Sequence, residues 1–572
     1  MDARRLKIAL LFFVLIAAAT YPLVNVFKPV LPTGEDSLFN VWRVSVVAHQ
    51  LRSDPAHLLD GNVFFPERRT LTFSDAMLAV AVIGTPFIWA GVHPVVVQNL
   101  LMLAGFVTSA LAAYMLCREL TSDDAAAFYG GVVFSLAPFR FAHINHLELQ
   151  WAAFIPLTLW LLYRASSACA QLPRGQREIG PAAGAASALA RASGDKKSAP
   201  SPSLRHATAA GLAFTVQGLC SLYYLAFFTI YLAAWTILTA ATSSPASRLR
   251  LLRAIGVLGV VAAILLTPYY LAYASSQQTF GPRRTDEVSQ FSAVPSDYLR
   301  VSEENKLRRA SSLDAQDERS LFPGFVTIAL AVVAIVAGAD RQRFVFAALA
   351  ALAFELSLGS NGQVYPLLLR LVPAFGSFRA PARCGIFVLL SLAALSSIGL
   401  AALSRKLHAR TRGLVIAVLL AGSVAEYWSA PVHTREVPLA PSNVYRWLAS
   451  QPRAVVLELP TPQPGRLWYV ETVYQYMSTY HWHWLVNGYS GHVPTSYAKT
   501  IAAIAERNPA SIGTRLDEIG VRYLVLHEKF YEPAEFADAL NLFANLPHAG
   551  ALHSFQDRDD PAVVISWNTS GK

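Results

Sequence analysis

Long apolar segments recur along the first 429 residues, and they constrain this chain more than any other feature. A helix needs about 20 mostly apolar residues to cross the roughly 30 Å hydrocarbon core of a membrane. Only 15% of the residues are charged, against about 25% in a soluble protein. The sequence therefore predicts an α-helical polytopic membrane protein. We expect eleven transmembrane helices, at about 6–27, 95–116, 125–138, 149–163, 207–221, 224–240, 254–273, 322–338, 343–358, 384–403 and 414–429.

The positive residues predict how these spans are oriented. Arg4, Arg5 and Lys7 precede the first span, and positive residues stay on the cytoplasmic side. The net charge of +10 falls mostly in short loops between spans, so it indicates topology and excludes nucleic-acid binding. We expect a bacterial inner (plasma) membrane protein with a cytoplasmic N-terminus. The basic stretch 164–205 lacks apolar periodicity and is expected to be a disordered cytoplasmic loop.

The remaining segments are expected on the outer side. They comprise outer loops 28–92, 274–320 and 359–383 on a bundle formed by residues 1–429, followed by a small periplasmic α/β domain at 430–572. Within the first loop, residues 76–91 are apolar and contain Pro86, which favours a re-entrant or interfacial helix; a true span here would change the count. In the C-terminal region we expect strands at 453–459, 521–526 and 562–567 and helices at 442–450, 497–507 and 534–545.

Most candidate functional residues lie on this outer side. The acidic pair Glu35 and Asp36 follows the first span after Gly34. His143 and His146 are three residues apart, and Glu148 follows them. Two histidines and a carboxylate can hold a divalent metal, or they can cap helices and bind substrate through hydrogen bonds. We favour the second interpretation. Further candidates for substrate binding are Asp75, Arg140, His143, His146, Glu148, Glu318, Arg379 and Arg383.

Arg379 and Arg383 are four residues apart, and we expect them either to bind a phosphate group together or to reach lipid headgroups. Phosphate-binding Walker loops, nucleophile elbows and H-E-x-x-H motifs do not occur in the sequence. The spans carry almost no charge at mid-membrane, whereas transporters usually place ionisable groups there. This pattern argues against transport.

Four short motifs resemble the GT-C superfamily of membrane glycosyltransferases, and most closely its bacterial YfhO-like and related uncharacterised members. They are Gly34-Glu35-Asp36, Glu318-Arg-Ser-Leu-Phe-Pro-Gly324, Phe378-Arg-Ala-Pro-Ala-Arg383 and Asn487-Gly-Tyr-Ser-Gly491.

The resemblance implies transfer of a hexosyl or pentosyl group from a polyprenyl-phosphate donor to a glycan, lipid or protein acceptor. It implies that Asp36, with Glu35 as the alternative, is the catalytic base, and that Asp75 or Glu148 is a second acid. A divalent cofactor is left open. Trp482, Trp484 and Tyr489 are expected to stack on sugar.

Two other functions are compatible with the sequence. A transporter, polymerase or ligase of lipid-linked glycans would use the same outer face without the same transfer chemistry. A non-catalytic membrane scaffold would tolerate replacement of every outer polar residue. An essential Asp36 would favour the transferase over both.

Overall fold

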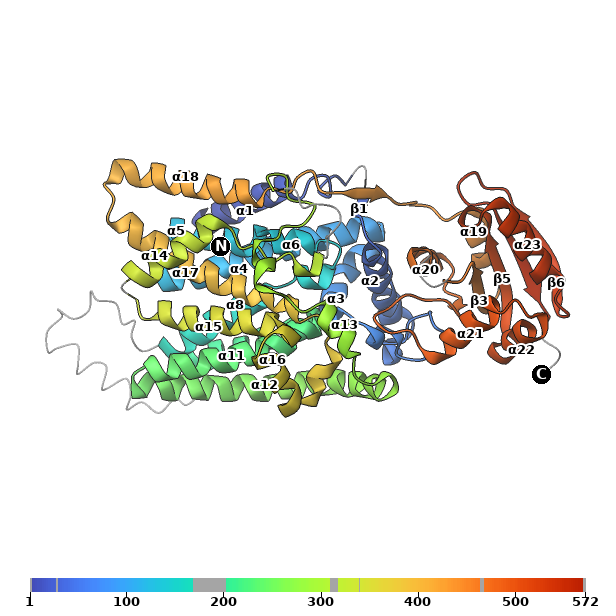
Figure 1. The fold of residues 1–572 in the computed structure, drawn as a ribbon, viewed down its shortest axis with the longest axis horizontal. Coiled ribbons are helices and arrows are strands. Elements are labelled where there is room, and N and C mark those ends of the chain that lie inside the picture. The colour runs from blue at the N-terminus through green and yellow to red at the C-terminus, as the bar shows by residue number, and fades with distance from the viewer. Residues whose placement is uncertain are drawn as a thin grey trace, which may run out of the picture.

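The computed structural model describes residues 3–26, 29–167, 202–308, 317–338, 340–462 and 468–568. A bundle of long helices occupies one end of the molecule, and a small mixed sheet with its own helices occupies the other (Figure 1). The expected cytoplasmic loop falls almost entirely on residues 168–201, which lie outside the described residues.

The bundle contains a helix at each expected span. Five stretches of the described residues have the length and hydropathy of a membrane span: Pro94–Thr121, Asp124–Ala142, Leu222–Thr242, Pro245–Phe280 and Pro381–Arg405. A multi-pass membrane protein is therefore confirmed, while the count of eleven remains a prediction. The helices are α1 (Ala3–Ala19), α4 (Pro94–Thr121), α5 (Asp124–Leu136), α8 (Phe154–Ser167), α10 (Pro202–Cys220), α11 (Leu222–Thr242), α12 (Pro245–Phe280), α14 (Phe325–Ala337), α15 (Gln342–Ser357), α17 (Gly385–Arg405) and α18 (Ala409–Tyr427).

Helix α17 lies at the centre of the bundle, and α12 lies at its edge. Most of α17 is buried against α14, α15 and α5, and a Cβ on Gly399 would lie 1.9 Å from the Leu330 carbonyl oxygen. Glycine therefore permits the close approach of α17 to α14. Helix α12 exposes Val260 and Ile264, as a helix in contact with lipid would. Its 36 residues make it about 54 Å long, so it extends well beyond one hydrocarbon thickness.

Shorter helices gather at the end of the bundle that faces the sheet. Helix α2 (Asp36–Ser53) is buried along most of its length. Helix α3 (Leu78–Trp89), in the expected re-entrant or interfacial segment, has 12 residues and is about 18 Å long, too short to cross a membrane. Other short helices are α6 (Pro138–Ala142), α7 (Leu147–Gln150), α13 (Thr285–Gln290) and α16 (Val364–Leu371).

The C-terminal region forms a five-stranded sheet in the order β4-β3-β5-β7-β6, with β3 parallel to β4 and β5 and the other pairs antiparallel. Its strands are β3 (Val455–Leu459), β4 (Trp484–Leu485), β5 (Val521–His527), β6 (Ala549–Phe555) and β7 (Ala562–Trp567). Its helices are α19 (Asn443–Ser450), α20 (Trp468–Met477), α21 (Thr495–Ala505), α22 (Pro509–Ile519) and α23 (Pro533–Ala544).

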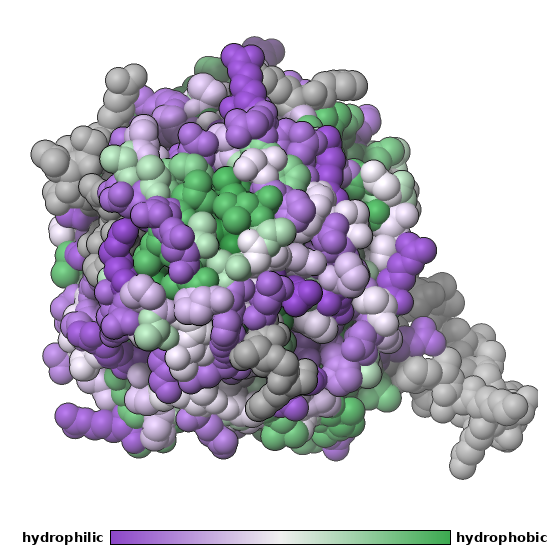
Figure 2. Space-filling view, turned by 90° about the vertical axis from the view of Figure 1, so that its right-hand side faces the viewer, coloured by the Kyte–Doolittle hydropathy of each residue, from purple (hydrophilic) through white to green (hydrophobic). Residues whose placement is uncertain are grey.

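The three expected strands and three expected helices of this region are present within two residues of their expected bounds. Strands β4 and β6 and helices α20 and α22 were not predicted. The outward surface of this end is mainly hydrophilic, with one apolar area (Figure 2). A water-facing region is consistent with this surface, and the domain boundary at residue 430 remains a prediction.

Main-chain hydrogen bonds join this region to the first outer segment. Strand β1 (Val30–Pro32) pairs antiparallel with β2 (Thr434–Glu436). The Leu485 amide donates to the Asn62 carbonyl at 2.8 Å, and the Phe65 amide donates to the Leu485 carbonyl at 2.8 Å. Residues far apart in the sequence are thus placed beside one another at the junction.

Candidate active site

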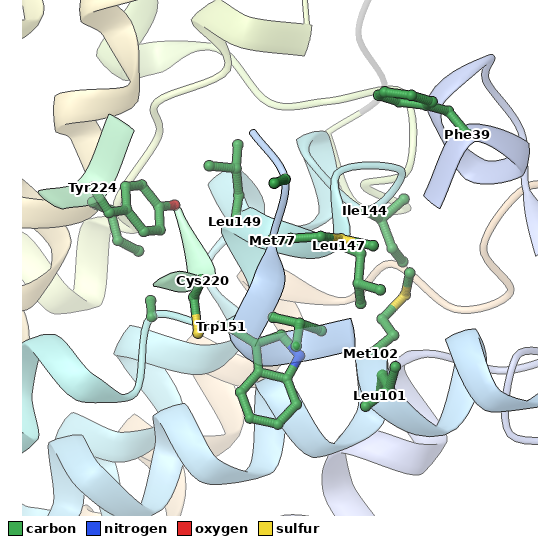
Figure 3. Packing of buried hydrophobic residues seen from close by; sticks show 14 of the residues in the cluster. Phe39, Met77, Leu101, Met102, Ile144, Leu147, Leu149, Trp151, Cys220 and Tyr224 are labelled. Atoms are coloured by element: carbon green, nitrogen blue, oxygen red, sulfur yellow. The ribbon is translucent and has the colours of Figure 1, made fainter. Parts of the chain in front are cut away.

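A cavity of about 760 Å³ lies at this junction. It contains most of the site residues that the sequence predicted: Glu35, Asp36, Asp75, His146, Glu148, Arg379 and Arg383. Met77, Leu147 and Leu149 belong to the buried apolar core, as does Phe39, which also lines the cavity (Figure 3). The polar side chains are therefore held on a rigid apolar base.

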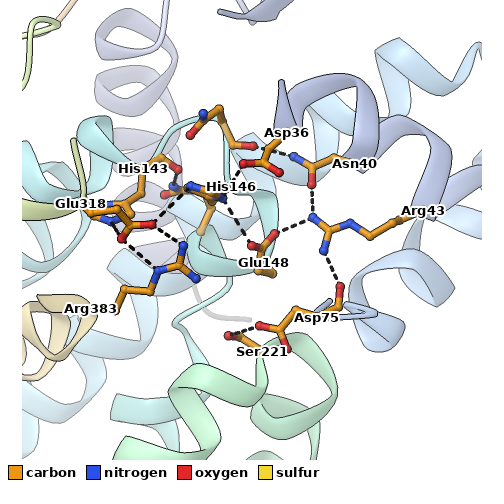
Figure 4. Close-up of polar contacts among 12 residues, drawn as sticks. Asp36, Asn40, Arg43, Asp75, His143, His146, Glu148, Ser221, Glu318 and Arg383 are labelled. Carbon is orange, nitrogen blue, oxygen red and sulfur yellow. Dashed lines mark hydrogen bonds and ion pairs between the residues drawn. The ribbon is translucent and has the colours of Figure 1, made fainter. Parts of the chain in front are cut away.

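Part of the cavity lining is an acidic wall, which we define as Glu35, Asp36, His146 and Glu148 together with Arg43. Figure 4 shows its members other than Glu35. His146 Nδ1 lies 3.3 Å from Asp36 Oδ2 and 3.6 Å from Glu148 Oε1. Arg43 Nη2 lies 2.8 Å from Glu148 Oε2. Asp36 begins α2, where the positive helix N-terminus favours a carboxylate. His146 thus lies between two acids that come from different segments.

The charges of this wall depend on one another. Burial alone would raise the pKa of Glu148, but Arg43 and His146 hold it well below its usual range. Burial alone would lower the pKa of His146, but Asp36 and Glu148 raise it. Burial and the adjacent Asp36 raise the pKa of Glu35. The wall therefore favours a charged Glu148 and a positive His146, while Glu35 takes up a proton more readily than an ordinary glutamate.

Asp75 has a clear structural role in this cavity. Its two carboxylate oxygens accept hydrogen bonds from the Ser221 hydroxyl at 2.9 Å and from the Leu222 amide at 2.8 Å. Those donors belong to the start of α11, so Asp75 caps that helix. Burial and the nearby Glu148 raise its pKa to about 6. Of the two candidates for a second acid, Glu148 is the one that shares His146 with Asp36.

Three expected binding residues form a buried layer around the acidic wall. Glu318 accepts from Arg383 Nε at 3.0 Å, and His143 Nε2 lies 2.9 Å from the same carboxylate. Burial alone would raise the pKa of Glu318, but Arg383 and His143 hold it well below its usual range. Arg383 is also stacked over Tyr223. His143 and Glu318 do not line the cavity, and much of the hydrogen-bonding capacity of Arg383 is used within the protein.

Arg140 is likewise behind the cavity. Its guanidinium is almost fully buried and donates to the Gln150 carbonyl at 2.7 Å and to the Leu149 carbonyl at 3.4 Å. It also lies over the Phe106 ring. These contacts hold the loop that carries His146 and Glu148, so the structure gives Arg140 a supporting position.

Another part of the cavity lining is a basic wall, which we define as Arg283, Arg379 and His492. Both arginines interact with the single carboxylate of Glu287: Arg283 Nη1 lies 3.4 Å and Arg379 Nη1 3.3 Å from its Oε1. Burial and the two arginines lower the pKa of His492 to about 4, so this histidine is neutral. Two positive groups thus share one acid, which leaves an excess of positive charge on this side.

Sequence reasoning missed Arg283 and His492. Arg283 follows the end of α12 in Gly281-Pro282-Arg283-Arg284, and a pair of arginines directly after a long apolar helix is the signal that was available. His492 stacks on Phe280 with a ring-centroid distance of 4.5 Å, a contact that only the fold creates. Its position could not have been inferred from local sequence.

Of the three aromatic residues expected to stack on sugar, one lines the cavity and two do not. Tyr489 lines the cavity, as does Trp468, which was not predicted. Trp482 instead stacks on His49 at 3.8 Å, and Trp484 lies beside Phe65. Neither of these two tryptophans lines the cavity. Sugar stacking at this site would therefore involve Tyr489 and Trp468.

A metal site is not evident in the described ranges. Among these residues, no group of three or more His, Cys, Asp or Glu side chains has an arrangement that could hold a metal ion. His146 and Glu148 are engaged in the ion pairs described above. His143 pairs with Glu318 and His146 with Asp36, and the role of the histidine pair remains a prediction.

Comparisons with known proteins give a fold but no family. No family model matches the sequence, and no curated protein matches it. The structure resembles the arabinofuranosyltransferase AftD from Mycobacteria, with a TM-score of 0.60 and 13% identity over 99% of this chain and 40% of that chain. It also resembles the oligosaccharyltransferase AglB from Archaeoglobus fulgidus, with a TM-score of 0.54 and 12% identity over 99% of this chain and 74% of that chain.

The chain spans less than half the length of AftD, and at these identities the likeness is one of fold. The predicted GT-C fold is confirmed at this level, whereas the YfhO-like subgroup is not. The chain therefore shares its fold with GT-C membrane glycosyltransferases.

Proposed function

We propose that this protein transfers a sugar from a polyprenyl-phosphate donor to an acceptor hydroxyl at the outer face of the inner membrane. The observation that carries the proposal is one cavity lined both by the Asp36 carboxylate and by the Arg283 and Arg379 guanidinium groups. AglB, which shares the fold, has been solved in complex with an inhibitory peptide and a dolichol-phosphate. A lipid-linked phosphate donor is therefore compatible with this architecture.

Asp36 is the proposed catalytic base. Its side chain is 22% exposed, whereas that of Glu148 is 6% exposed and bound to Arg43. The acceptor hydroxyl gives its proton to Asp36 while its oxygen forms a bond to the anomeric carbon. The bond from that carbon to the phosphate oxygen breaks, and the electron pair leaves with the lipid phosphate. A positioned base typically contributes about 10²- to 10⁴-fold in rate.

The basic wall is the proposed site for the donor phosphate. Arg379 is 35% exposed and comes from a different segment than Arg283, so a phosphate between them would be bound from two directions. Charge-assisted hydrogen bonds from guanidinium groups strengthen as negative charge develops on the leaving oxygen. Arg383, already bound to Glu318, would contribute its charge more than its hydrogen bonds.

The lipid tail has an apolar path from the cavity. Tyr270 on α12 and Pro373 and Ala374 after α16 line the cavity. Next to them, Leu271 and Leu371 are exposed to more than half of their full extent. The segment after α16 meets the end of α12, where the Arg283 amide donates to the Gly376 carbonyl at 2.8 Å and the Ser377 hydroxyl donates to Gln277 Oε1 at 2.6 Å. A polyprenyl chain leaving the cavity here would enter the hydrocarbon region.

An assay with labelled polyprenyl-phosphate sugars and a lipid extract as acceptor source tests the proposal. We expect Asp36→Asn to insert normally and to lower transfer at least about 100-fold, because it removes the proton acceptor and keeps the shape. Glu35→Gln should have a milder effect. Near-normal transfer by Asp36→Asn together with an inactive Glu35→Gln would show that Glu35, and not Asp36, is the catalytic base. Activity in both variants would contradict the proposed site.

The proposal also requires the cavity to face outward. Reporter fusions after Gly194 and after Lys572 should report a cytoplasmic loop and an outer C-terminus, respectively. A cytoplasmic signal from the C-terminal fusion would place the cavity on the wrong side of the membrane.

A further inference from the structure

We propose that Tyr489, which enters the cavity from the C-terminal region, is a positioning residue that holds the Glu35–Asp36 pair as two carboxylates ready for the acceptor. This inference rests on the proposed function, because it assigns a role within the same site. It implies that residues after the bundle complete the acidic wall.

The position of Tyr489 is the first observation. Its side chain lines the cavity, and its ring meets that of Phe39 edge-on at 5.4 Å. Its hydroxyl is close enough to Glu35 and Asp36 for the two acids to affect its pKa, and it affects the pKa of Glu35 in turn. Burial and the two acids raise the pKa of Tyr489 above its ordinary value. The phenol therefore stays neutral and can donate its proton in a hydrogen bond.

The backbone that carries Tyr489 is fixed by α20. The Gly488 amide donates to Glu471 Oε2 at 2.8 Å, and the Tyr489 amide donates to Gln475 Oε1 at 2.9 Å. A Cβ on Gly488 would lie 2.9 Å from the Phe64 ring, so a larger residue would displace this loop. The donor of the hydrogen bond is thus held by buried groups, which is what preorganisation requires.

The acid pair is also held from its other side by the C-terminal region. Arg435 on β2 donates from Nη2 to the Gly34 carbonyl at 2.9 Å. Gly34 has φ of +118°, a conformation that favours glycine, and it is followed directly by Glu35. Strand β2 is paired with β1 just before this glycine. Strand β2 therefore holds the backbone of the Gly34-Glu35-Asp36 motif, and the loop that carries Tyr489 contacts its acidic side chains.

Electrostatics explains why the pair needs such a partner. Burial and Asp36 raise the pKa of Glu35, while Tyr489 and Arg435 act in the opposite direction. Removing the phenol hydroxyl should therefore raise the pKa of Glu35 further, so that Glu35 takes up a proton at higher pH. The charged and titratable groups around the pair are Arg43 on α2, His146 before α7, Glu148 on α7, Arg379 before α17, Arg435 on β2 and Tyr489 after β4.

The test is the pH dependence of single-turnover transfer by full-length Tyr489→Phe, which keeps the ring and its packing. At neutral pH we expect transfer about tenfold slower, the lower end of what a hydrogen bond to a charged group contributes. We also expect the acidic limb of the profile to move to higher pH and the rate to recover at alkaline pH. Tyr476→Phe is the matched control, because its hydroxyl donates to the Pro438 carbonyl at 2.9 Å and it does not line the cavity.

The outcomes separate this inference from the proposed function. A Tyr489→Phe variant with the wild-type transfer rate and pH profile overturns the inference. A loss of transfer rate that is equal at every pH also overturns it, because such a loss would indicate a role in packing alone. Asp36→Asn is measured in parallel. If Asp36→Asn is inactive and Tyr489→Phe is unaffected, only the inference fails. If Asp36→Asn is fully active, the assignment of Asp36 as the base fails, and if the wild type transfers no sugar, the proposed function fails.

Discussion

The two walls of the cavity hold their charges in different ways. On the acidic wall, Arg43 is only 2% exposed and is bound to Glu148, to Asn40 and to the Asp75 carbonyl. On the basic wall, Arg379 is 35% exposed and shares Glu287 with Arg283. The first arrangement satisfies its charges internally, whereas the second leaves positive charge available to a ligand. On this basis we propose that the acidic wall holds a fixed geometry and that the basic wall binds a ligand.

The largest expected effect comes from breaking the acidic wall at Arg43. Arg43→Met would leave Glu148 buried without its cation, and removing one partner of a buried ion pair typically costs about 3–5 kcal/mol. Thermal unfolding of the purified protein in detergent should show this loss. Arg379→Met is the matched control and should cost about 1 kcal/mol or less. Equal stability losses in the two variants would remove the distinction between the walls.

The next effect concerns ligand binding by the basic wall. Arg379→Ala should weaken donor binding about 10- to 100-fold, because a hydrogen bond to a charged group contributes about 1.5–3 kcal/mol. Arg379→Lys keeps the charge and loses the planar guanidinium group. Its donor affinity should therefore lie between those of Arg379→Ala and the wild type. Donor KM in the transfer assay measures both. If Arg379→Ala together with Arg283→Ala leaves KM unchanged, this wall does not hold the phosphate.

Much of the fold could be predicted from the sequence, because membrane spans depend on composition over about 20 residues. The strands Val455–Leu459 and Val521–His527 were equally visible as apolar runs. Strand β4, with two residues, and the exposed edge strand β6 lack such a pattern, so their pairing with the sheet depends on tertiary contacts.

The candidate site could be predicted only where position or spacing in the sequence identifies a residue. Asp36 could be located by its place after the first span, and His146 and Glu148 by their spacing. Arg283 and His492 became site residues only because α12 extends beyond the bundle to meet the loop after β4. Trp482 and Trp484 looked suitable from their chemistry, but the fold turns them to His49 and Phe65. Local sequence shows which groups are available and not which way they face.

The smallest expected effect separates Asp75 from the other acids of the cavity. Asp75→Asn keeps one acceptor for the start of α11, so it should cost about 1 kcal/mol of stability, as a weakened helix cap does. Transfer at saturating substrate should stay within a few fold of the wild type. A loss of 100-fold or more, with normal stability, would make Asp75 the second catalytic acid and would place chemistry at a helix cap.

The division of labour between the walls can be measured directly by separating donor binding from the chemical step. Donor affinity and the single-turnover transfer rate at saturating donor would be determined for Asp36→Asn and Arg379→Ala. We predict that Asp36→Asn binds the donor with wild-type affinity and transfers at least about 100-fold more slowly. Arg379→Ala should bind about tenfold or more weakly, while most of its rate returns at saturation. The reverse pattern, with weak binding in Asp36→Asn and an unrecovered rate in Arg379→Ala, would contradict the account.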